Sequence, residues 1–242
     1  HGRFEHLIEA VLQSPPEQRP AAVILLGDLQ ARQPLEVELA AILAHTEVWF
    51  IPGNHDTDSG ADHDHLFGSA LAGRNLHGRV VEIAGVRVAG LGGVFRGQVW
   101  MPPNPSEVET ARGYVARAGR GNLWRGGLPR RHRSTIFPAE VQALSRQRAD
   151  VLVTHEAPSC HPHGFQALDA LARCLQVRQA FHGHHHDRRD YRPEWPRLGF
   201  EAHGVGLRGI TALDGQVIRV GELDERRAIR GGYAAPPGCR LP

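Results

Sequence analysis

The order of apolar and polar residues along the chain predicts an α/β fold. Apolar positions at helical spacing alternate with short continuous apolar runs, which are typical of buried strands. The expected elements are helices at 3–13, 35–44, 138–147 and 165–175, and strands at 22–26, 47–51, 150–154 and 179–181. Alternation of this kind indicates βαβ units with right-handed crossovers.

The remaining segments break this alternation. Two apolar runs, 80–83 and 86–89, are separated by Ala84-Gly85 and predict a hairpin. Residues 57–65 are acidic and contain histidine, which predicts a loop followed by a short helix. Towards the C-terminus we expect a turn and short strands, the turn at 213–215 and the strands near 188–192, 198–203 and 216–222.

Residues 92–138 differ in amino-acid composition from the rest of the chain. They are rich in glycine, proline and arginine, and between Arg112 and Arg133 there are seven arginines and no acidic residue. A segment of this length is too long for an ordinary connection, so we expect a functional loop or a small cap. The chain is otherwise expected to form one domain over 1–225, with a Gly/Pro-rich tail at 226–242.

Composition and charge narrow the classes of function. With 242 residues and 41% hydrophobic content the chain can bury one sizeable core, and a formal net charge of +2 gives no overall attraction to nucleic acid or membrane. Cys160, Cys174 and Cys239 have no CxxC spacing, so we expect structural cysteines rather than a disulfide framework or a zinc site. The lack of a signal peptide or an apolar run of ~20 residues favours a cytoplasmic location.

Four predicted strands each end in Asp, Asn or His. The motifs are Gly27-Asp28, Gly53-Asn54-His55-Asp56, Thr154-His155 and Gly183-His184-His185-His186. Because the carboxyl ends of parallel strands lie together and form a ligand-binding crevice, we expect these side chains to meet in one site. Oxygen and imidazole ligands suit divalent metals. The pattern therefore predicts an enzyme site that binds metal.

Asp28 is the expected bridging carboxylate of a two-metal centre, since it stands at a strand end directly after a glycine. Asn54, His155, His184 and His186 would supply neutral ligands from the other strand ends. His184 and His186 are two residues apart, so on an extended segment both would point the same way, towards two neighbouring metals.

In residues, order and spacing, these motifs resemble four of the five signature blocks of the calcineurin-like metallophosphoesterase family. The first block of that family is Asp-x-His-Gly, and His1-Gly2 matches its second half. We therefore expect an aspartate two positions before His1, and the first strand of the fold before that aspartate. The resemblance implies a four-layer α/β/β/α sandwich, in which two mixed sheets are flanked by helices.

The resemblance also implies a role for each motif residue. The first metal is expected on the upstream aspartate, His1, Asp28 and His186, and the second on Asp28, Asn54, His155 and His184. His55 is expected to contact the phosphoryl oxygen or protonate the leaving group, with Asp56 orienting its ring. His182 and His185 are expected to be bystanders.

The implied reaction is hydrolysis of a phosphomonoester or phosphodiester through a metal-bridging hydroxide, by a hydrolase with two divalent ions. Manganese is the first expectation, and iron, zinc and nickel also fit these ligands. Arg96 follows a strand end, and Arg125 and Arg130 lie in the arginine-rich segment, so these three are the candidate substrate-binding residues. The expected partner is a small phosphorylated substrate, nucleotide-like if an aromatic residue of that region stacks on a base.

Other interpretations stay open. The arginines could form a solvated loop, or could hold nucleic acid in a nuclease, which we do not favour. A non-catalytic scaffold of the same fold is a further alternative, but retention of the motif residues, His55 above all, favours the hydrolase. The sequence makes no prediction about the oligomeric state.

Overall fold

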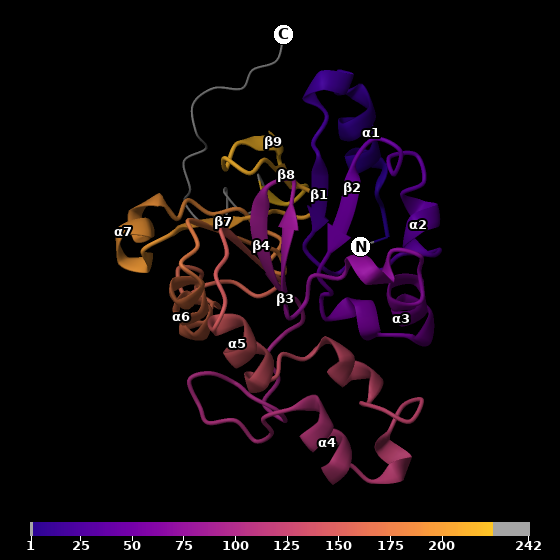
Figure 1. The fold of residues 1–242 in the computed structure, drawn as a ribbon, viewed down its shortest axis with the longest axis vertical. Helices are drawn as coiled ribbons and strands as arrows, with labels where there is room; N and C mark the ends of the chain where they lie inside the picture. Colours follow the sequence, from indigo (N-terminus) through magenta and orange to yellow (C-terminus); the bar gives the residue numbers. More distant parts are fainter. Residues whose placement is uncertain (1, 225–242) are drawn as a thin grey trace.

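The structure of the protein is a computed structural model that describes residues 2–224 (Figure 1). His1, Cys239 and the expected tail at 226–242 lie outside the described residues. The helices of the described part are α1 (Glu5–Gln13), α2 (Leu35–Glu38), α3 (Gly60–Phe67), α4 (Ala111–Arg117), α5 (Pro138–Ser145), α6 (Gln166–Leu175) and α7 (Trp195–Leu198). None of these helices is long and apolar enough to cross a bilayer.

The described strands form a two-stranded sheet, a five-stranded sheet and a separate strand pair. The first sheet pairs β1 (Ala22–Leu25) in parallel with β2 (Glu47–Phe50). The second sheet contains, in spatial order, β3 (Arg79–Ile83), β4 (Val86–Leu91), β5 (Val151–Thr154), β6 (Gln179–His182) and β7 (Glu201–Gly204). The β3–β4 pair is the predicted hairpin, and β4 to β7 are parallel. The third pair, β8 (Ile210–Thr211) and β9 (Val217–Arg219), is antiparallel.

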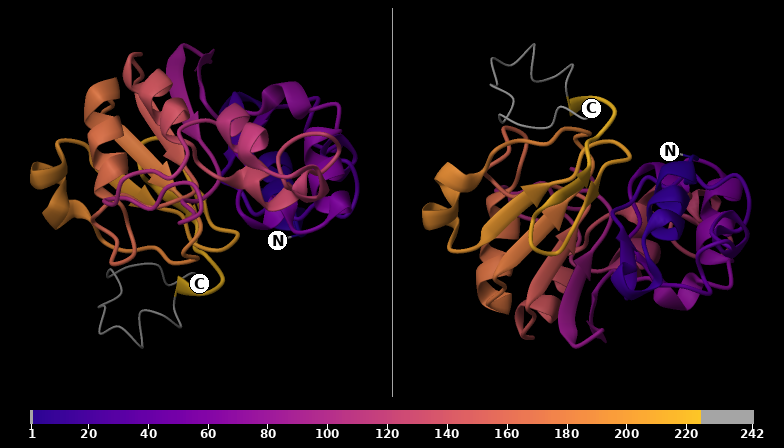
Figure 2. Two further views of the ribbon diagram at one scale, coloured as in Figure 1. Left: turned by 90° about the horizontal axis from the view of Figure 1, so that it is seen from below. Right: turned by 90° about the horizontal axis from the view of Figure 1, so that it is seen from above.

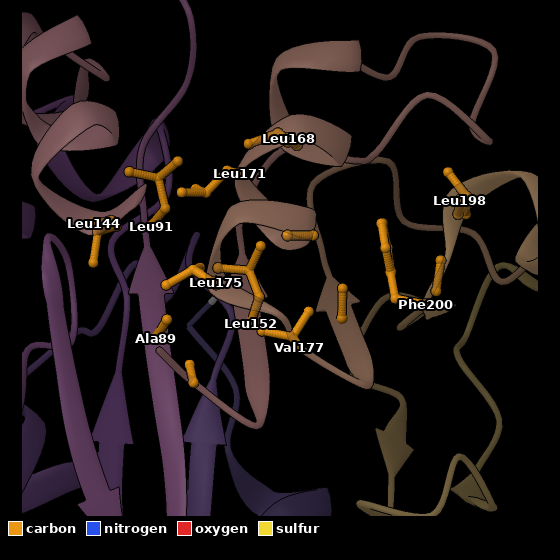
Figure 3. Close-up of a cluster of buried hydrophobic side chains, with 14 of the residues drawn as sticks. Ala89, Leu91, Leu144, Leu152, Leu168, Leu171, Leu175, Val177, Leu198 and Phe200 are labelled. Carbon is orange, nitrogen blue, oxygen red and sulfur yellow. The ribbon is translucent and has the colours of Figure 1, made fainter. Parts of the chain in front are cut away.

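Alternation of side chains along the strands divides the buried residues into three cores. Ile24 of β1 and Val151 of β5 pack between the two sheets. Phe50, on the opposite face of the small sheet, packs with residues of α1, α2 and α3. Leu152 of β5 packs with Leu171 of α6 on the far face of the large sheet (Figure 3). The layers are therefore helices, sheet, sheet and helices, which confirms the expected α/β/β/α sandwich (Figure 2).

The register of the strands brings the predicted motifs to one edge. Leu25 of β1 pairs with Phe50 of β2, so the loops that follow them leave the small sheet side by side. In the large sheet Thr154 of β5 pairs with His182 of β6, and the next residues again leave together. The two edges meet where the side chain of His155 reaches the carbonyl oxygen of Leu26, 2.7 Å away.

One edge of β1 has no strand partner among residues 2–224. A cavity of about 700 Å³ is lined by β1, by α1 and by inward-facing apolar residues of the large sheet such as Val153 and Phe181. The strand expected before His1 stays a prediction.

Three expectations about secondary structure are wrong. The supposed loop at 57–65 is largely α3, because the Ser59 hydroxyl accepts the Asp62 N–H at 3.0 Å and caps the helix. The expected helix at 35–44 is α-helical only over Leu35–Glu38 and continues as turns. The strand near 188–192 is absent, because Asp190 Oδ1 accepts the Arg192 N–H at 3.1 Å and turns the chain into the 3₁₀ segment Arg192–Glu194, which α7 follows.

Residues 92–137 carry no strand of either main sheet. They contain α4 and short 3₁₀ turns, and the α4 part lies beyond the ends of the sheets at the bottom of Figure 1. The division of the chain into one domain, a cap and a tail stays a prediction.

Candidate metal centre

Asp28 stands at the centre of the site, in the turn that follows β1. Its φ is +56°, and that of Gly27 is +89°, so the chain reverses sharply here. A Cβ atom at Gly27 would lie 2.5 Å from His155 Nδ1 and 2.6 Å from Gly53 N. Glycine is therefore required at position 27 both by its conformation and by the close approach of the two neighbouring motifs.

His155 presents one ring nitrogen to this centre. Its Nδ1–H donates to the carbonyl oxygen of Leu26 at 2.7 Å, which leaves Nε2 with a free lone pair when the ring is neutral. Nε2 lies 3.4 Å from Asp28 Oδ2 and 3.3 Å from Asn54 Oδ1. The side chains of Asp28 and His155 are nearly inaccessible to solvent.

The group fits a cation because its atoms are all electron-pair donors that face one another. Asp28, His155 and His184 each offer a ligand atom, and these atoms lie within 4.8 Å of one another. The Nδ1 atom of His184 is buried and has no hydrogen-bond partner among the described residues. Such a set needs a proton or a metal ion to relieve the repulsion of its lone pairs, and its mixture of imidazole and oxygen suits a divalent transition metal.

The pKa values of Asp28, His155 and His184 show which of these groups holds a proton most readily. Burial acts to raise the pKa of Asp28, but the hydrogen bond and charge of His155 outweigh it and lower this pKa to about 2. Burial acts to lower the pKa of His155, but the Asp28 carboxylate outweighs it and raises this pKa. For His184, burial and then the charge of His155 lower the pKa to about 4. In the absence of metal, a proton at this centre therefore favours the ring of His155 over Asp28 and His184.

Three predicted ligands have left-handed backbone conformations. The φ angles are +56° for Asp28, +65° for His184 and +59° for His186. Such angles in non-glycine residues cost on the order of 1 kcal/mol each and cluster at functional sites. The segment 183–186 is therefore turned rather than extended, and the expectation that two-residue spacing aligns His184 and His186 on an extended segment is wrong.

The other three predicted metal ligands are Asn54, His186 and His1, of which the structure describes Asn54 and His186. Asn54 lies at the centre through its Oδ1 atom. His186 lies outside the three-residue group, although its charge lowers the pKa of His184 further. His1 is not described, but its neighbour Gly2 donates its N–H to the carbonyl oxygen of Leu29 at 2.7 Å, beside Asp28.

Asp56 is placed differently from the expectation. Its carboxylate is buried and accepts three backbone N–H groups, from Leu29 at 2.6 Å, Gln30 at 3.0 Å and Gly53 at 2.7 Å. Burial raises its pKa to about 6, against the lowering effect of these N–H groups. Asp56 thus ties the turn after β1 to the turn after β2, and does not orient the ring of His55.

The ring of His55 instead contacts Asp58, which the sequence analysis missed. His55 Nδ1 lies 2.5 Å from Asp58 Oδ2, and the backbone N–H of His55 donates to Asp28 Oδ1 at 2.9 Å. His55 is therefore attached to the metal centre by its backbone and held in orientation by a carboxylate three residues later. The signal was present in the sequence, because residues three apart in a helical turn lie on the same face.

Glu156 is a second residue that the sequence analysis missed. It follows His155 directly, is buried, and accepts the Phe95 N–H at 3.2 Å through Oε1. Its Oε2 atom lies 3.8 Å from His184 Nε2. Burial raises the pKa of Glu156 to about 7. An acidic residue directly after a predicted metal ligand was the available signal.

The three candidate arginines have different surroundings. Arg96 is half-buried, and its Nε–H donates to Thr135 Oγ1 at 3.1 Å; no carboxylate within the described part of the chain pairs with it. Burial, then the charge of Arg131, lower its pKa, whereas the charges of Asp58 and Glu156 act in the opposite direction. Arg96 therefore lies between Asp58 and Glu156 in charge terms, and it forms no ion pair with a described residue.

Arg125 and Arg130 are engaged by the protein. Arg125 forms a two-pronged ion pair with Asp64 of α3, at 2.6 and 2.8 Å, and stacks over Trp124. Arg130 donates to the carbonyl oxygens of Thr57 and Asp58, at 3.1 and 2.6 Å. Arg130 thus supports the turn that carries His55, while Arg125 ties the arginine-rich segment to α3.

Comparisons with known proteins agree with this geometry. The family model described as calcineurin-like phosphoesterase matches residues 1–188. An uncharacterized protein of Haemophilus influenzae is 42% identical over 226 residues, which cover 93% of this chain and 96% of the relative. The crystal structure of TT1561 of Thermus thermophilus has the same fold, with a TM-score of 0.52, 17% identity and 84% coverage of each chain. The chain therefore belongs to the calcineurin-like phosphoesterase family.

Proposed function

We propose that this protein is a metal-dependent hydrolase that cleaves a small phosphomonoester or phosphodiester. Membership of the family supports metal-dependent phosphoesterase chemistry in general. The observation that carries the proposal is the approach of His155 Nε2 to Asp28 Oδ2 and Asn54 Oδ1, at 3.4 and 3.3 Å, with His184 completing the group.

In this proposal two divalent cations share Asp28. His1, Asp28 and His186 belong to the first site, and Asp28, Asn54, His155 and His184 to the second. Bound there, the cations would lower the pKa of a water molecule and neutralise the phosphoryl oxygens. Manganese is our first choice for the ion, and iron, zinc and nickel suit the same mixture of ligands.

The protein's own groups then have distinct tasks. His55 exchanges a proton with the leaving group or contacts a phosphoryl oxygen, and Asp58 holds its ring by the 2.5 Å contact. Asp56 keeps the turns that carry Asp28 and His55 at a fixed separation, since it accepts N–H groups from both turns. Catalysis depends on this rigidity, because small displacements of reacting groups cost large factors in rate.

Arg96 is the proposed substrate-binding residue among the three candidates. Its guanidinium is half-buried and close to Asp58 and Glu156, and no described carboxylate neutralises it. A phosphoryl oxygen would accept from it in a charge-assisted hydrogen bond. Arg125 already forms its two-pronged contact with Asp64, so we assign it no role in binding.

Recognition of a nucleobase receives no support from the aromatic residues. Trp124 is covered by Arg125 and Arg133, and Tyr114 lies against His132. Trp100 packs against Phe95. We therefore propose that the phosphate group, rather than a base, dominates binding.

The test is hydrolysis of p-nitrophenyl phosphate and bis(p-nitrophenyl) phosphate with added Mn²⁺, by the full-length protein and by His55→Ala. We expect wild-type turnover of at least one ester, and a loss of ~10²–10⁴-fold in kcat for His55→Ala. A wild-type protein that binds Mn²⁺ but cleaves neither ester would favour the non-catalytic scaffold. Full activity in His55→Ala would remove His55 from the proposed chemistry.

A further inference from the structure

A second group of histidines lies next to the segment that carries His184 and His186. His161 is 3% exposed and comes from the loop between β5 and α6. Its ring stacks on that of His185, with centroids 3.8 Å apart and planes inclined by 14°. His185 stands between the two proposed ligands in the sequence, so this contact reaches the metal-binding segment directly.

The tautomer of the neutral His161 ring is set by its own loop. The backbone N–H of His163 donates to His161 Nδ1 at 3.1 Å, so Nδ1 carries no proton and the neutral ring must carry it on Nε2. Nε2 lies 3.4 Å from Asp187 Oδ1, longer than a good hydrogen bond but close enough for attraction between the N–H dipole and the carboxylate. Arg189 Nε, 3.0 Å from Asp187 Oδ2, holds the other side of that carboxylate.

The same segment is held at its start by another buried histidine. His182 Nδ1 lies 3.1 Å from the carbonyl oxygen of Gly183, and its Nε2 lies 3.2 Å from the hydroxyl of Tyr191. Other residues therefore contact the segment 183–187 at three positions, Gly183, His185 and Asp187. His161 makes two of these three contacts.

These contacts are important because the backbone conformation of the segment 183–187 is unfavourable without them. His184 and His186 both have left-handed φ angles, which non-glycine residues adopt only when the surroundings hold them there. Without the stack on His185 and the contact to Asp187, the segment would relax towards ordinary backbone angles. The two proposed ligands would then no longer be held in their present orientation.

We propose that His161 is a positioning residue of the metal centre, which fixes His184 and His186 by stacking on His185 and by facing Asp187. The inference rests on the proposed function only in taking His184 and His186 as metal ligands. In this proposal His185 is not the bystander that the sequence analysis expected. Through its ring, the loop after β5 supports the loop after β6.

The test measures metal binding rather than turnover. Metal-free wild-type protein and the variants His161→Ala and His161→Phe are titrated with Mn²⁺ by calorimetry, with free Mn²⁺ counted by electron paramagnetic resonance. Changes to groups that support metal ligands typically weaken affinity ~10–100-fold, so we expect His161→Ala to raise the Kd for Mn²⁺ at least tenfold. His161→Phe keeps a stacking ring and should recover part of that loss.

His132→Ala is the matched control. His132 is equally buried, at 2% exposure, and packs on Tyr114 without touching the metal-binding segment. We expect it to lower thermal stability but to keep the wild-type Kd and stoichiometry. If His161→Ala does not fold, His161→Gln, which keeps an N–H donor of similar reach, is compared with His161→Phe instead.

The outcomes separate the two proposals. If wild type binds Mn²⁺ and His161→Ala binds it with the same Kd and stoichiometry, the positioning role is overturned while the proposed function stands. If His161→Ala loses affinity, His161→Phe recovers part of it and the control His132→Ala keeps the wild-type Kd, the role is supported. If wild type binds no Mn²⁺ or other divalent transition metal, the proposed function fails, and the role of His161 fails with it.

Discussion

The Nδ1 atom of His55 lies 2.5 Å from the Oδ2 atom of Asp58, so a carboxylate three residues further along the same turn orients the proposed acid. An N–H on Nδ1 directed at Asp58 leaves Nε2 to face the substrate. We expect Asp58→Asn to lower kcat about tenfold, which is ~1.4 kcal/mol of transition-state stabilisation, with little change in KM. The measurement is steady-state kinetics on p-nitrophenyl phosphate. Unchanged kcat would mean that this contact has no catalytic role.

Asp56 should matter for stability as much as for activity. Its buried carboxylate accepts three backbone N–H groups, and Asp56→Ala would leave all three without a partner. We expect the free energy of unfolding to fall by about 2–4 kcal/mol, measured by urea denaturation of the metal-free protein. Asp62→Ala, which changes an aspartate on α3, is the control and should cost much less. Equal losses in the two variants would contradict the bracing role of Asp56.

The arginines provide a paired test of substrate binding. Within residues 2–224 no carboxylate forms an ion pair with Arg96, whereas Arg125 is occupied by Asp64. We expect Arg96→Gln to raise KM or lower kcat/KM about tenfold, which corresponds to one charge-assisted hydrogen bond of ~1.5–3 kcal/mol. Arg125→Gln should leave both constants near wild type. The reverse order would overturn the assignment of Arg96 as the substrate-binding residue.

Gly53 should tolerate no side chain. A Cβ atom there would meet Asp28 Oδ1 and would lie 2.6 Å from His155 Cε1, so it would push two proposed ligands apart. We expect Gly53→Ala to abolish Mn²⁺ binding in calorimetry, while the overall fold persists by circular dichroism. Gly97→Ala is the matched control, because a Cβ atom at Gly97 meets nothing within 4 Å. Normal metal binding by Gly53→Ala would place the metal elsewhere.

Metal binding should compete with protons at His155. Asp28 raises the pKa of His155 against the effect of burial, and the metal requires the neutral ring. Binding should therefore release protons and weaken as the pH falls through the raised pKa of His155, by up to about tenfold per unit. Calorimetry in buffers of different ionisation enthalpy measures the proton release directly. Identical heats in all buffers, with a Kd independent of pH, would exclude His155 as a ligand.

The sequence predicted the site better than it predicted the details around it. Asp28, Asn54, His155 and His184 were found because each follows an apolar strand, and parallel pairing carries strand ends to one edge. The hairpin at Ala84-Gly85 was also predictable from neighbouring residues, because these two residues form the turn between its strands. Such predictions need only the spacing of the apolar residues and the position at which each apolar run ends.

The partners of the charged groups could not be predicted in the same way. The pairing of Arg125 with Asp64 joins residues 61 apart in the sequence, and the contact of His161 with Asp187 joins two different loops. Nothing in the local pattern distinguishes these arginines and histidines from solvated ones. The left-handed angles of His184 and His186 also depend on contacts with other loops, so an extended segment was the natural expectation.

The most direct test of the central claim combines metal content and turnover in one titration. Protein stripped with a chelator is titrated with Mn²⁺, and bound metal and p-nitrophenyl phosphate hydrolysis are measured on the same samples for wild type and Asp28→Ala. We expect wild-type activity to be absent without metal and to rise in proportion to bound Mn²⁺, and Asp28→Ala to lose metal and at least ~10²-fold of the rate. Equal hydrolysis with and without metal, or full activity in Asp28→Ala, would contradict the account.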